Sequence, residues 1–327
     1  MDYSELKKEI LSKKNIVILT HKNPDGDAIG SSVGLSLVLN EIGLNTKVIV
    51  PNEAPAFLRW INSYDAILNF ETHQAAATEQ IQNADVIFCL DFNALHRIGE
   101  MGDLVAQSSA FKVLIDHHLQ PEDFADFTLS KTSASSTCEL VYEFTEALEA
   151  TNSITKAAAE AIYTGLITDT GSFKFPSTSA YTHRVAGELI NKGANNGKIH
   201  QLIYDSNSIS RIKVLGYCLN NMEIIEDKVA FFSLSTNTQQ DLGTVKGDTE
   251  GIVNYGLSIS TVMVSAFFRE EAGMIKISFR SKGDHDVNLF ARTYFDGGGH
   301  KNAAGGCSTS SLEETIAKFK NCVQDFF

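Results

Sequence analysis

Aspartate and histidine side chains that could bind metal ions follow several short apolar runs in this chain. Those directly after such runs are His21, Asp25, Asp27, Asp91, Asp116, His117 and His118. A further carboxylate, Asp169, lies in a Thr-Asp-Thr-Gly sequence at the end of an apolar segment. Any one of these residues alone could be an ordinary loop or capping residue. Their joint pattern, always at the end of a predicted strand or helix, predicts a metal centre.

The residue types also indicate which ions would bind. Crowded carboxylates repel one another unless cations lie between them, and two divalent ions would neutralise four aspartates. Carboxylates with some imidazole and no thiolate favour Mn²⁺, with Mg²⁺ or Co²⁺ as alternatives, and give zinc no advantage. Two such ions in one site can promote in-line attack on phosphorus. The sequence therefore predicts a two-metal phosphoesterase.

The elements that must position these residues form an α/β pattern. Continuous apolar runs at 15–20, 47–50, 85–90 and 112–115 alternate with helical segments, the first of them at 28–41. Such runs predict a buried parallel sheet with helices on both faces. Ligands bind at the carboxyl ends of parallel strands. Three strands would therefore deliver carboxylates and imidazoles to one edge.

Two domains are expected from the length of 327 residues. Further helices are predicted at 135–149, 154–168 and 179–191. Beyond them the pattern becomes richer in strands, at 229–234, 261–269 and 274–280, and the chain ends on an amphipathic helix, 312–327. We therefore predict a catalytic metal-binding domain over 1–192, a linker helix over 193–212 and a smaller, mixed α/β substrate-binding domain over 213–327.

Charge and cysteine content exclude several functions. The net charge of −13 argues against a long nucleic-acid track, which needs a basic surface. Five scattered cysteines without a CxxC pair argue against a disulfide framework or a cysteine zinc site. No apolar run is long enough to span a bilayer, and the charged start does not indicate a secretory signal. We expect a cytoplasmic protein without a membrane partner.

A glycine-rich segment in the second half could bind an anion. Gly297, Gly298 and Gly299 are followed by His300 and Lys301, and Arg280 lies in the same locally basic stretch, 274–303. Consecutive glycine amides can form an anion-binding nest, to which charged side chains add stronger hydrogen bonds. The alternative is a loop that needs positive φ angles. The earlier stretch 26–34 does not have the GxGxxG spacing of a dinucleotide site.

The motifs resemble those of a known group, the DHH phosphoesterase superfamily. The similar segments are His21-Lys-Asn-Pro-Asp25-Gly-Asp27, Asp91, Asp116-His117-His118 and Asp169, and 297–306 is similar to the signature of the DHHA1 domain. The resemblance covers nearly the whole chain, and no motif departs from the pattern. In length and two-domain plan the chain is most similar to the nanoRNase branch, bifunctional oligoribonucleases and pAp phosphatases.

That resemblance implies a role for each residue. His21 and Asp25 would bind one metal ion, Asp27, His117 and Asp169 the other, and Asp91 would bridge both. Asp116 would orient its neighbours, and His118 would face the substrate phosphate and assist the leaving group. Gly298, Gly299, His300, Lys301 and Arg280 would bind substrate across a cleft between the domains.

The implied function is hydrolysis of very short single-stranded oligonucleotides to 5′-mononucleotides, with 3′-phosphoadenosine 5′-phosphate (pAp) as a second substrate and a homodimer as the expected assembly. Cleavage of linear or cyclic dinucleotides in signalling is the close alternative. A RecJ-type exonuclease would be longer, and a polyphosphatase or pyrophosphatase would lack the glycine-rich signature. A regulatory module that only binds nucleotides would show no metal-dependent turnover.

Overall fold

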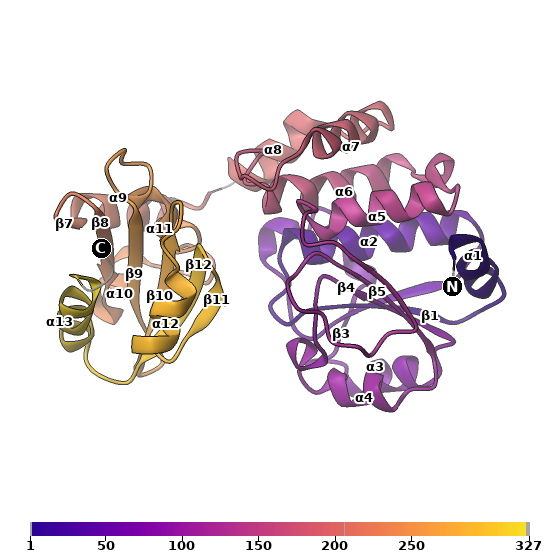
Figure 1. Ribbon diagram of the computed structural model, residues 1–327, viewed down its shortest axis with the longest axis horizontal. Coiled ribbons are helices and arrows are strands. Elements are labelled where there is room, and N and C mark those ends of the chain that lie inside the picture. The colour runs from indigo at the N-terminus through magenta and orange to yellow at the C-terminus, as the bar shows by residue number, and fades with distance from the viewer. Residues whose placement is uncertain (1, 206, 325–327) are drawn as a thin grey trace. The chain divides into compact units, whose positions relative to one another are not determined.

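The computed structural model describes residues 2–205 and 207–324 (Figure 1). The chain forms two compact units, Met1–Ser206 and Asn207–Phe327, and each is described by itself. The segment predicted as a linker, 193–212, contains α8 (Asn196–Tyr204) and the first residues of α9 (Ile209–Asn220).

The first unit is built on six parallel strands in the order β3-β2-β1-β4-β5-β6 (Figure 1). The strands are β1 (Ile16–Thr20), β2 (Thr46–Val50), β3 (Leu68–Asn69), β4 (Val86–Leu90), β5 (Phe111–Asp116) and β6 (Phe127–Ser130). The two central strands, β1 and β4, are buried at every residue, because helices cover both faces. β3 and β6, at the edges, were not predicted; they are short and carry no continuous apolar run.

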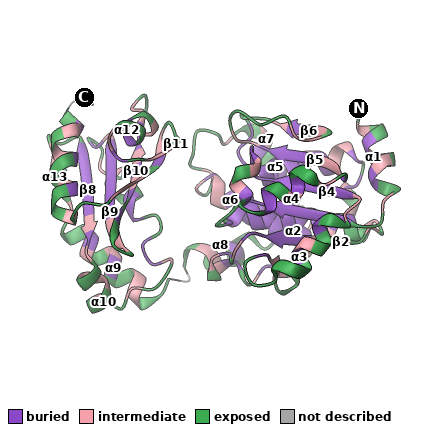
Figure 2. Ribbon diagram, turned by 90° about the horizontal axis from the view of Figure 1, so that it is seen from below, coloured by how far each residue is buried: buried purple, intermediate pink, exposed green. Residues whose placement is uncertain are grey.

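Helices form a layer on each face of this sheet (Figures 1 and 2). They are α1 (Tyr3–Leu11), α2 (Gly26–Glu41), α3 (Gln74–Gln82), α4 (Met101–Gln107), α5 (Thr137–Ala147), α6 (Lys156–Asp169), α7 (Ala180–Asn191) and α8. Side chains of α1, α2, α5 and α6 pack on one face, in a core that includes Ile18 and Phe88. Side chains of α3 and α4 pack on the other, with Val17 and Ile87. The alternation of neighbouring strand residues between two cores explains why these strands are apolar throughout.

Helices α2 and α6 pack unusually closely, because glycines replace side chains along their contact. A Cβ atom on Gly30 would lie 2.6 Å from the carbonyl oxygen of Ala161, and one on Gly34 would lie 2.4 Å from the side chain of Ile162. A Cβ on Gly165 would approach the Asp27 backbone to 2.9 Å. The glycines of segment 26–34 thus serve helix packing, and this packing sets the spacing between the start of α2 and the end of α6.

The second unit contains a mixed sheet in the order β11-β12-β10-β9-β8-β7, in which only the β8–β9 pair is parallel. Its strands are β7 (Glu223–Ile225), β8 (Val229–Leu234), β9 (Val264–Glu271), β10 (Met274–Ser281), β11 (Gly298–His300) and β12 (Ala303–Ser308). Its helices are α9, α10 (Thr236–Leu242), α11 (Ile252–Gly256), α12 (Val287–Tyr294) and α13 (Leu312–Val323). A cluster of phenylalanines, including Phe268, Phe279 and Phe319, joins this sheet to α12 and α13.

The predicted α/β class is confirmed, with a parallel sheet covered on both faces and a second, smaller mixed domain. Within 2–205 and 207–324, none of the helices has the length and apolar character that crossing a membrane would require.

Candidate metal centre

The ends of three parallel strands and of two helices bring the predicted ligands together. His21 follows β1, Asp91 follows β4, and His117 follows β5. Asp25 is the N-cap of α2, where its carboxylate accepts hydrogen bonds from the amides of Asp27 and Ala28 at 3.0 and 3.1 Å. A polar residue that caps a helix at the carboxyl edge of a sheet is thereby fixed in position.

Asp27 lies in the first turn of α2 and is held by the start of another helix. Its two carboxylate oxygens accept hydrogen bonds from the amide of Thr137 at 2.6 Å and the amide of Cys138 at 2.9 Å. Both amides belong to the first turn of α5, where backbone N–H groups lack helical partners and favour negative charge. Asp27 is only 1% exposed, so this contact is fully shielded from water.

Asp91 occupies the centre of the cluster. Its carboxylate oxygens lie 3.4 Å from Nε2 of His21 and 3.6 Å from Nε2 of His117. The hydroxyl of Thr137 donates to Asp91 Oδ1 at 2.8 Å. Asp91 has a φ of 65°, a left-handed conformation that aspartate tolerates better than most residues. The backbone therefore turns sharply after β4 and directs this carboxylate at both histidines.

Two triplets of ligand atoms are close enough to hold one metal ion each. The first is His21, Asp25 and Asp91, and the second is Asp27, His117 and Asp169; within each, the atoms lie within 4.8 Å of one another. Nε2 of His117 is 3.4 Å from Asp169 and 4.0 Å from Asp27. Asp169, the last residue of α6, reaches this group because α6 packs so closely on α2.

Asp116 and His118 form a tight pair beside these triplets. Nδ1 of His118 lies 2.7 Å from Oδ1 of Asp116, and the His118 amide donates to Oδ2 at 3.1 Å. Asp116 is fully buried. His118 Nδ1 is also 3.8 Å from Asp91, so a third possible ligand group, Asp91 with His117 and His118, overlaps the other two. The carboxylate of Asp116 fixes which way the His118 ring faces.

The charges in this cluster strongly perturb one another. Burial raises the pKa of Asp27 well above its ordinary value, and repulsion from Asp91 and Asp169 adds to it. Burial likewise raises the pKa of Asp169 to about 7. Burial lowers the pKa of His21, but the hydrogen bond and charge of Asp91 outweigh that effect and raise it to about 9. Raised pKa values of two carboxylates beside a histidine of raised pKa show that these groups are strongly coupled, and divalent cations among them would relieve the repulsion.

The glycine-rich segment of the second unit is part of a β-hairpin. Gly298–His300 forms β11, and a Cβ on Gly297 would lie 2.0 Å from the carbonyl oxygen of Gly305, so only glycine fits there. The Gly299 amide donates to Asn288 Oδ1 at 2.9 Å, and the Gly297 amide to the carbonyl of Ala291 at 3.3 Å. The amides of Gly297 and Gly299 therefore already have partners within the protein, and the anion-binding nest stays a prediction.

The charged side chains near that hairpin differ in their environments. Lys301 forms an exposed ion pair with Asp284 at 2.7 Å. Arg280 is half-buried and donates to the carbonyl of Phe279 at 2.9 Å, and it has no carboxylate partner among the described residues. Burial lowers the pKa of Arg280.

Arg280 pairs with Ala303 on β12, and Ala303 pairs with His300 on β11. Arg280 and His300 thus lie in one row, on the same face of the sheet, on either side of a small residue.

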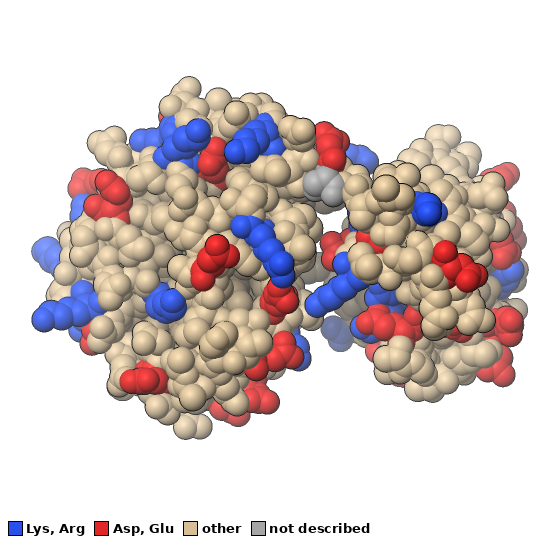
Figure 3. Space-filling view, turned by 180° about the vertical axis from the view of Figure 1, so that it is seen from behind, with Lys and Arg blue, Asp and Glu red and all other residues tan. Residues whose placement is uncertain are grey.

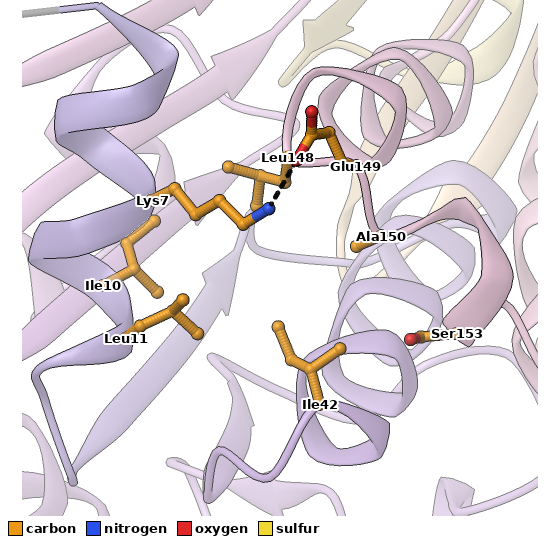
Figure 4. Close-up of a pocket in the computed structure, with 8 residues that line it drawn as sticks. All are labelled: Lys7, Ile10, Leu11, Ile42, Leu148, Glu149, Ala150 and Ser153. Carbon is orange, nitrogen blue, oxygen red and sulfur yellow. Dashed lines mark hydrogen bonds and ion pairs between the residues drawn. The ribbon is translucent and has the colours of Figure 1, made fainter.

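A pocket of about 210 Å³ lies elsewhere in the first unit (Figure 4). It is lined mainly by apolar side chains, including Ile10, Ile42 and Leu148, and the ion pair Lys7–Glu149 crosses its rim at 3.1 Å. None of the predicted ligands lines it. Its two charged side chains, Lys7 and Glu149, are already paired with each other.

Sequence reasoning missed the residues of α5 that hold the carboxylates, Thr137 and Cys138. A local signal for them exists. Ser136 caps α5 and accepts from the amide of Glu139, and this Ser-x-x-Glu spacing marks a helix start. The free amides of a helix start attract an anion. Only the tertiary contact, 110 residues apart in sequence, identifies that anion as Asp27.

Comparison with known proteins extends this picture. Residues 15–166 match the DHH family, N-terminal domain, and residues 226–327 match the DHHA1 domain. The bifunctional oligoribonuclease and PAP phosphatase NrnA of Bacillus subtilis is 31% identical over 92% of each chain. The cyclic-di-AMP phosphodiesterase GdpP of the same organism is 27% identical, covering 98% of this chain and 49% of its own length. The crystal structure of an exopolyphosphatase-related protein from Bacteroides fragilis is 42% identical, with a TM-score of 0.97, over 99% of this chain and 96% of its own.

Proposed function

This chain belongs to the DHH family and carries its DHHA1 domain, and from that membership we propose that it hydrolyses very short oligonucleotides to 5′-mononucleotides and also dephosphorylates pAp. Similarity over nearly the whole length to a bifunctional oligoribonuclease and PAP phosphatase carries this proposal. The DHH domain supplies a phosphoesterase centre that uses divalent metal, and the DHHA1 domain supplies substrate contacts.

The residues of the centre fit two divalent ions. In this proposal His21 and Asp25 hold one ion, Asp27, His117 and Asp169 hold the other, and Asp91 contacts both. The two triplets with Asp91 between them support this assignment. Oxygen and imidazole ligands favour Mn²⁺, with Mg²⁺ or Co²⁺ as alternatives. The ions would supply Lewis-acid activation of the phosphate and of the attacking water.

The protein's own groups orient the reactants around those ions. Asp116 holds Nδ1 of His118 and thereby orients the ring, and in this proposal the opposite ring nitrogen, Nε2, faces the substrate. That nitrogen can donate a hydrogen bond to a phosphate oxygen or a proton to the leaving oxygen. The amides of α5 neutralise part of the Asp27 charge and keep its carboxylate in one orientation.

Thr137 should be required for tight metal binding. We expect Thr137→Val to weaken Mn²⁺ affinity about tenfold or more, because a hydrogen bond to a charged group contributes roughly 1.5–3 kcal/mol. Thr137→Ser, which keeps the hydroxyl, should remain close to the parent. Thr164→Val is a matched control, since that hydroxyl is buried but bonds only within α6. Titration calorimetry measures the affinities, and equal values for the valine and serine variants would contradict the role.

In the second unit, Arg280 and His300 are proposed to bind a substrate phosphate, with Gly298, Gly299 and Lys301 around them. The support is their common row on one face and the absence of a carboxylate partner for Arg280 among the described residues. A half-buried guanidinium without a counter-ion is a favourable partner for phosphate.

Substitution of these two residues should weaken substrate binding. Arg280→Ala and His300→Ala are each expected to lower kcat/KM by about tenfold to a hundred-and-fiftyfold, mainly through KM, because a charge-assisted contact contributes roughly 1.5–3 kcal/mol. Lys276→Ala is the control, since Lys276 is on the same strand but is paired with Glu271. Steady-state kinetics on a dinucleotide decide the point. A change in kcat/KM below twofold in both variants would rule out the phosphate contact.

Substrates of two to five nucleotides should be cleaved much faster than one of twenty-four. The net charge of −13 repels a long polyanion, and on the face drawn in Figure 3 Lys and Arg are interspersed with Asp and Glu rather than gathered in a track. Few counterions would be released on binding, so the salt dependence should be shallow. The measurement is kcat/KM against length at two salt concentrations. Rates that rise with length and a log–log slope steeper than about −4 would indicate a processive exonuclease.

Cleavage of linear or cyclic dinucleotides in signalling is the second proposed function. The similarity to a cyclic-di-AMP phosphodiesterase over 98% of this chain favours it, but this chain spans about half of that relative. A panel with Mn²⁺ that contains a linear dinucleotide, a cyclic dinucleotide, pAp and inorganic polyphosphate ranks the activities. If the protein turns over none of these substrates, the remaining interpretation is a regulatory module that only binds nucleotides.

Two further expectations stay predictions. A homodimer would be seen as twice the mass of 35.7 kDa in light scattering. A cytoplasmic location would be tested by cell fractionation.

A further inference from the structure

A strained turn directly follows the metal-ligand candidate Asp169. Gly171, Ser172 and Phe173 have φ angles of 56°, 60° and 66°, so three consecutive residues are left-handed. Two of them carry side chains, for which this conformation is unfavourable. The turn is fixed by the side chain and carbonyl of Thr170, which accept from the amides of Phe173 and Phe175, each at 3.0 Å. It therefore folds the chain back onto the end of α6.

The turn carries one packed and one exposed aromatic ring. The ring of Phe173 lies 5.0 Å from that of His183 and packs on the core. Phe175 is 44% exposed, and it is the only exposed phenylalanine within 2–205 and 207–324. Its ring rests on Gly171, where a Cβ would lie 2.7 Å from the ring. A partly exposed aromatic ring is thus held against Gly171, two residues after Asp169.

The hydrogen bonds to Thr170 explain how the turn is held, but they leave the Phe175 ring 44% exposed. A single exposed apolar residue is common, but here it sits on backbone strain that the rest of the fold maintains, and such strain concentrates at functional sites. Lys174, beside it, is exposed. A ring and a cation at the edge of a phosphate-cleaving centre fit a ligand that has both a flat apolar face and negative charge.

We propose that Phe175 is a stacking platform for a nucleobase of the substrate. The inference rests on the proposed function and deepens it, because it explains selection of nucleotides over phosphates that lack a base. A base is separated from its own phosphate by one ribose, so a phosphate bound near Asp169 places its base within reach of this turn. Stacking on an aromatic ring tolerates every base, as an enzyme of short oligonucleotides of any sequence requires.

The kinetic test compares a dinucleotide with its abasic analogue. Phe175→Leu should raise KM for the dinucleotide about tenfold, the usual size of one base–aromatic stack, with kcat nearly unchanged. Phe175→Trp should keep the parent KM, and neither variant should change KM for the abasic analogue. Ile190→Ala, an exposed apolar residue on α7, is the control. Thermal melts confirm that each variant is folded.

The binding test uses a dinucleotide of 2-aminopurine joined by a non-hydrolysable phosphonate, whose fluorescence is quenched on stacking. Quenching should occur with the parent and Phe175→Trp and be lost with Phe175→Leu. Equal quenching in all three overturns the proposal. The proposal is also overturned if Phe175→Leu loses kcat equally on the dinucleotide and on its abasic analogue, because that result would mean that the turn only positions Asp169. Failure of the parent to hydrolyse any dinucleotide would instead overturn the proposed function, because the fluorescence experiment needs no turnover.

Discussion

Replacement of Asp91 by asparagine is expected to lower kcat about a thousandfold or more, roughly 4 kcal/mol of lost transition-state stabilisation. Asp91 is the one carboxylate within 3.6 Å of a histidine from each triplet, so loss of its charge should weaken both proposed ions at once. Asparagine is preferred to alanine because it tolerates the left-handed φ of 65° and keeps a partner for the Thr137 hydroxyl. The fold should therefore survive.

The measurement is kcat on a dinucleotide at saturating Mn²⁺, with circular dichroism of each variant. Asp103→Asn, an exposed aspartate in the first turn of α4, is the matched control and should behave as the parent. Turnover of Asp91→Asn within tenfold of the parent would exclude a role between the ions.

Removal of divalent metal should both abolish turnover and lower the melting temperature by roughly 10–20 °C. Each ion at a hundred times its Kd stabilises the native state by about 2.7 kcal/mol. Two ions therefore contribute about 5 kcal/mol, and in a domain of the size of the first unit, Met1–Ser206, 1 kcal/mol corresponds to roughly 2–4 °C. Without the ions, the buried carboxylates of Asp27 and Asp91 and the partly exposed carboxylate of Asp169 repel one another.

Calorimetry of chelated and Mn²⁺-loaded protein measures this shift. The Asp169→Asn variant should lose much of this Mn²⁺-dependent rise in melting temperature. Its metal-free form should be at least as stable as the metal-free parent, because one of the carboxylates that repel each other is gone. Asp103→Asn should retain the full shift. A melting temperature that does not depend on Mn²⁺ would show that the cluster is not a metal centre.

The sequence determined the parts of this protein that depend on local pattern. Four strands were predicted nearly at their observed bounds, because buried parallel strands are continuous apolar runs whatever their partners are. Helices α2, α5, α6 and α7 were predicted to within about two residues, since capping residues and glycine stops act within one turn. The candidate ligands were recognised because each polar residue stands directly after such an element.

Only the tertiary structure decided what those residues contact. The short strands β3 and β6 exist through parallel pairing with β2 and β5, and β12 through pairing with β10, which no local run encodes. The approach of Asp169 to Asp27 depends on two helices whose glycines remove the side chains between them.

Two further contacts depend on register and topology rather than on local sequence. Thr137 meets Asp91 across 46 residues of sequence. Arg280 and His300 share a row only because β12 pairs with both of their strands. A sequence shows which chemical groups a chain carries, but the distances between them arise from packing and strand register, which are properties of the whole fold.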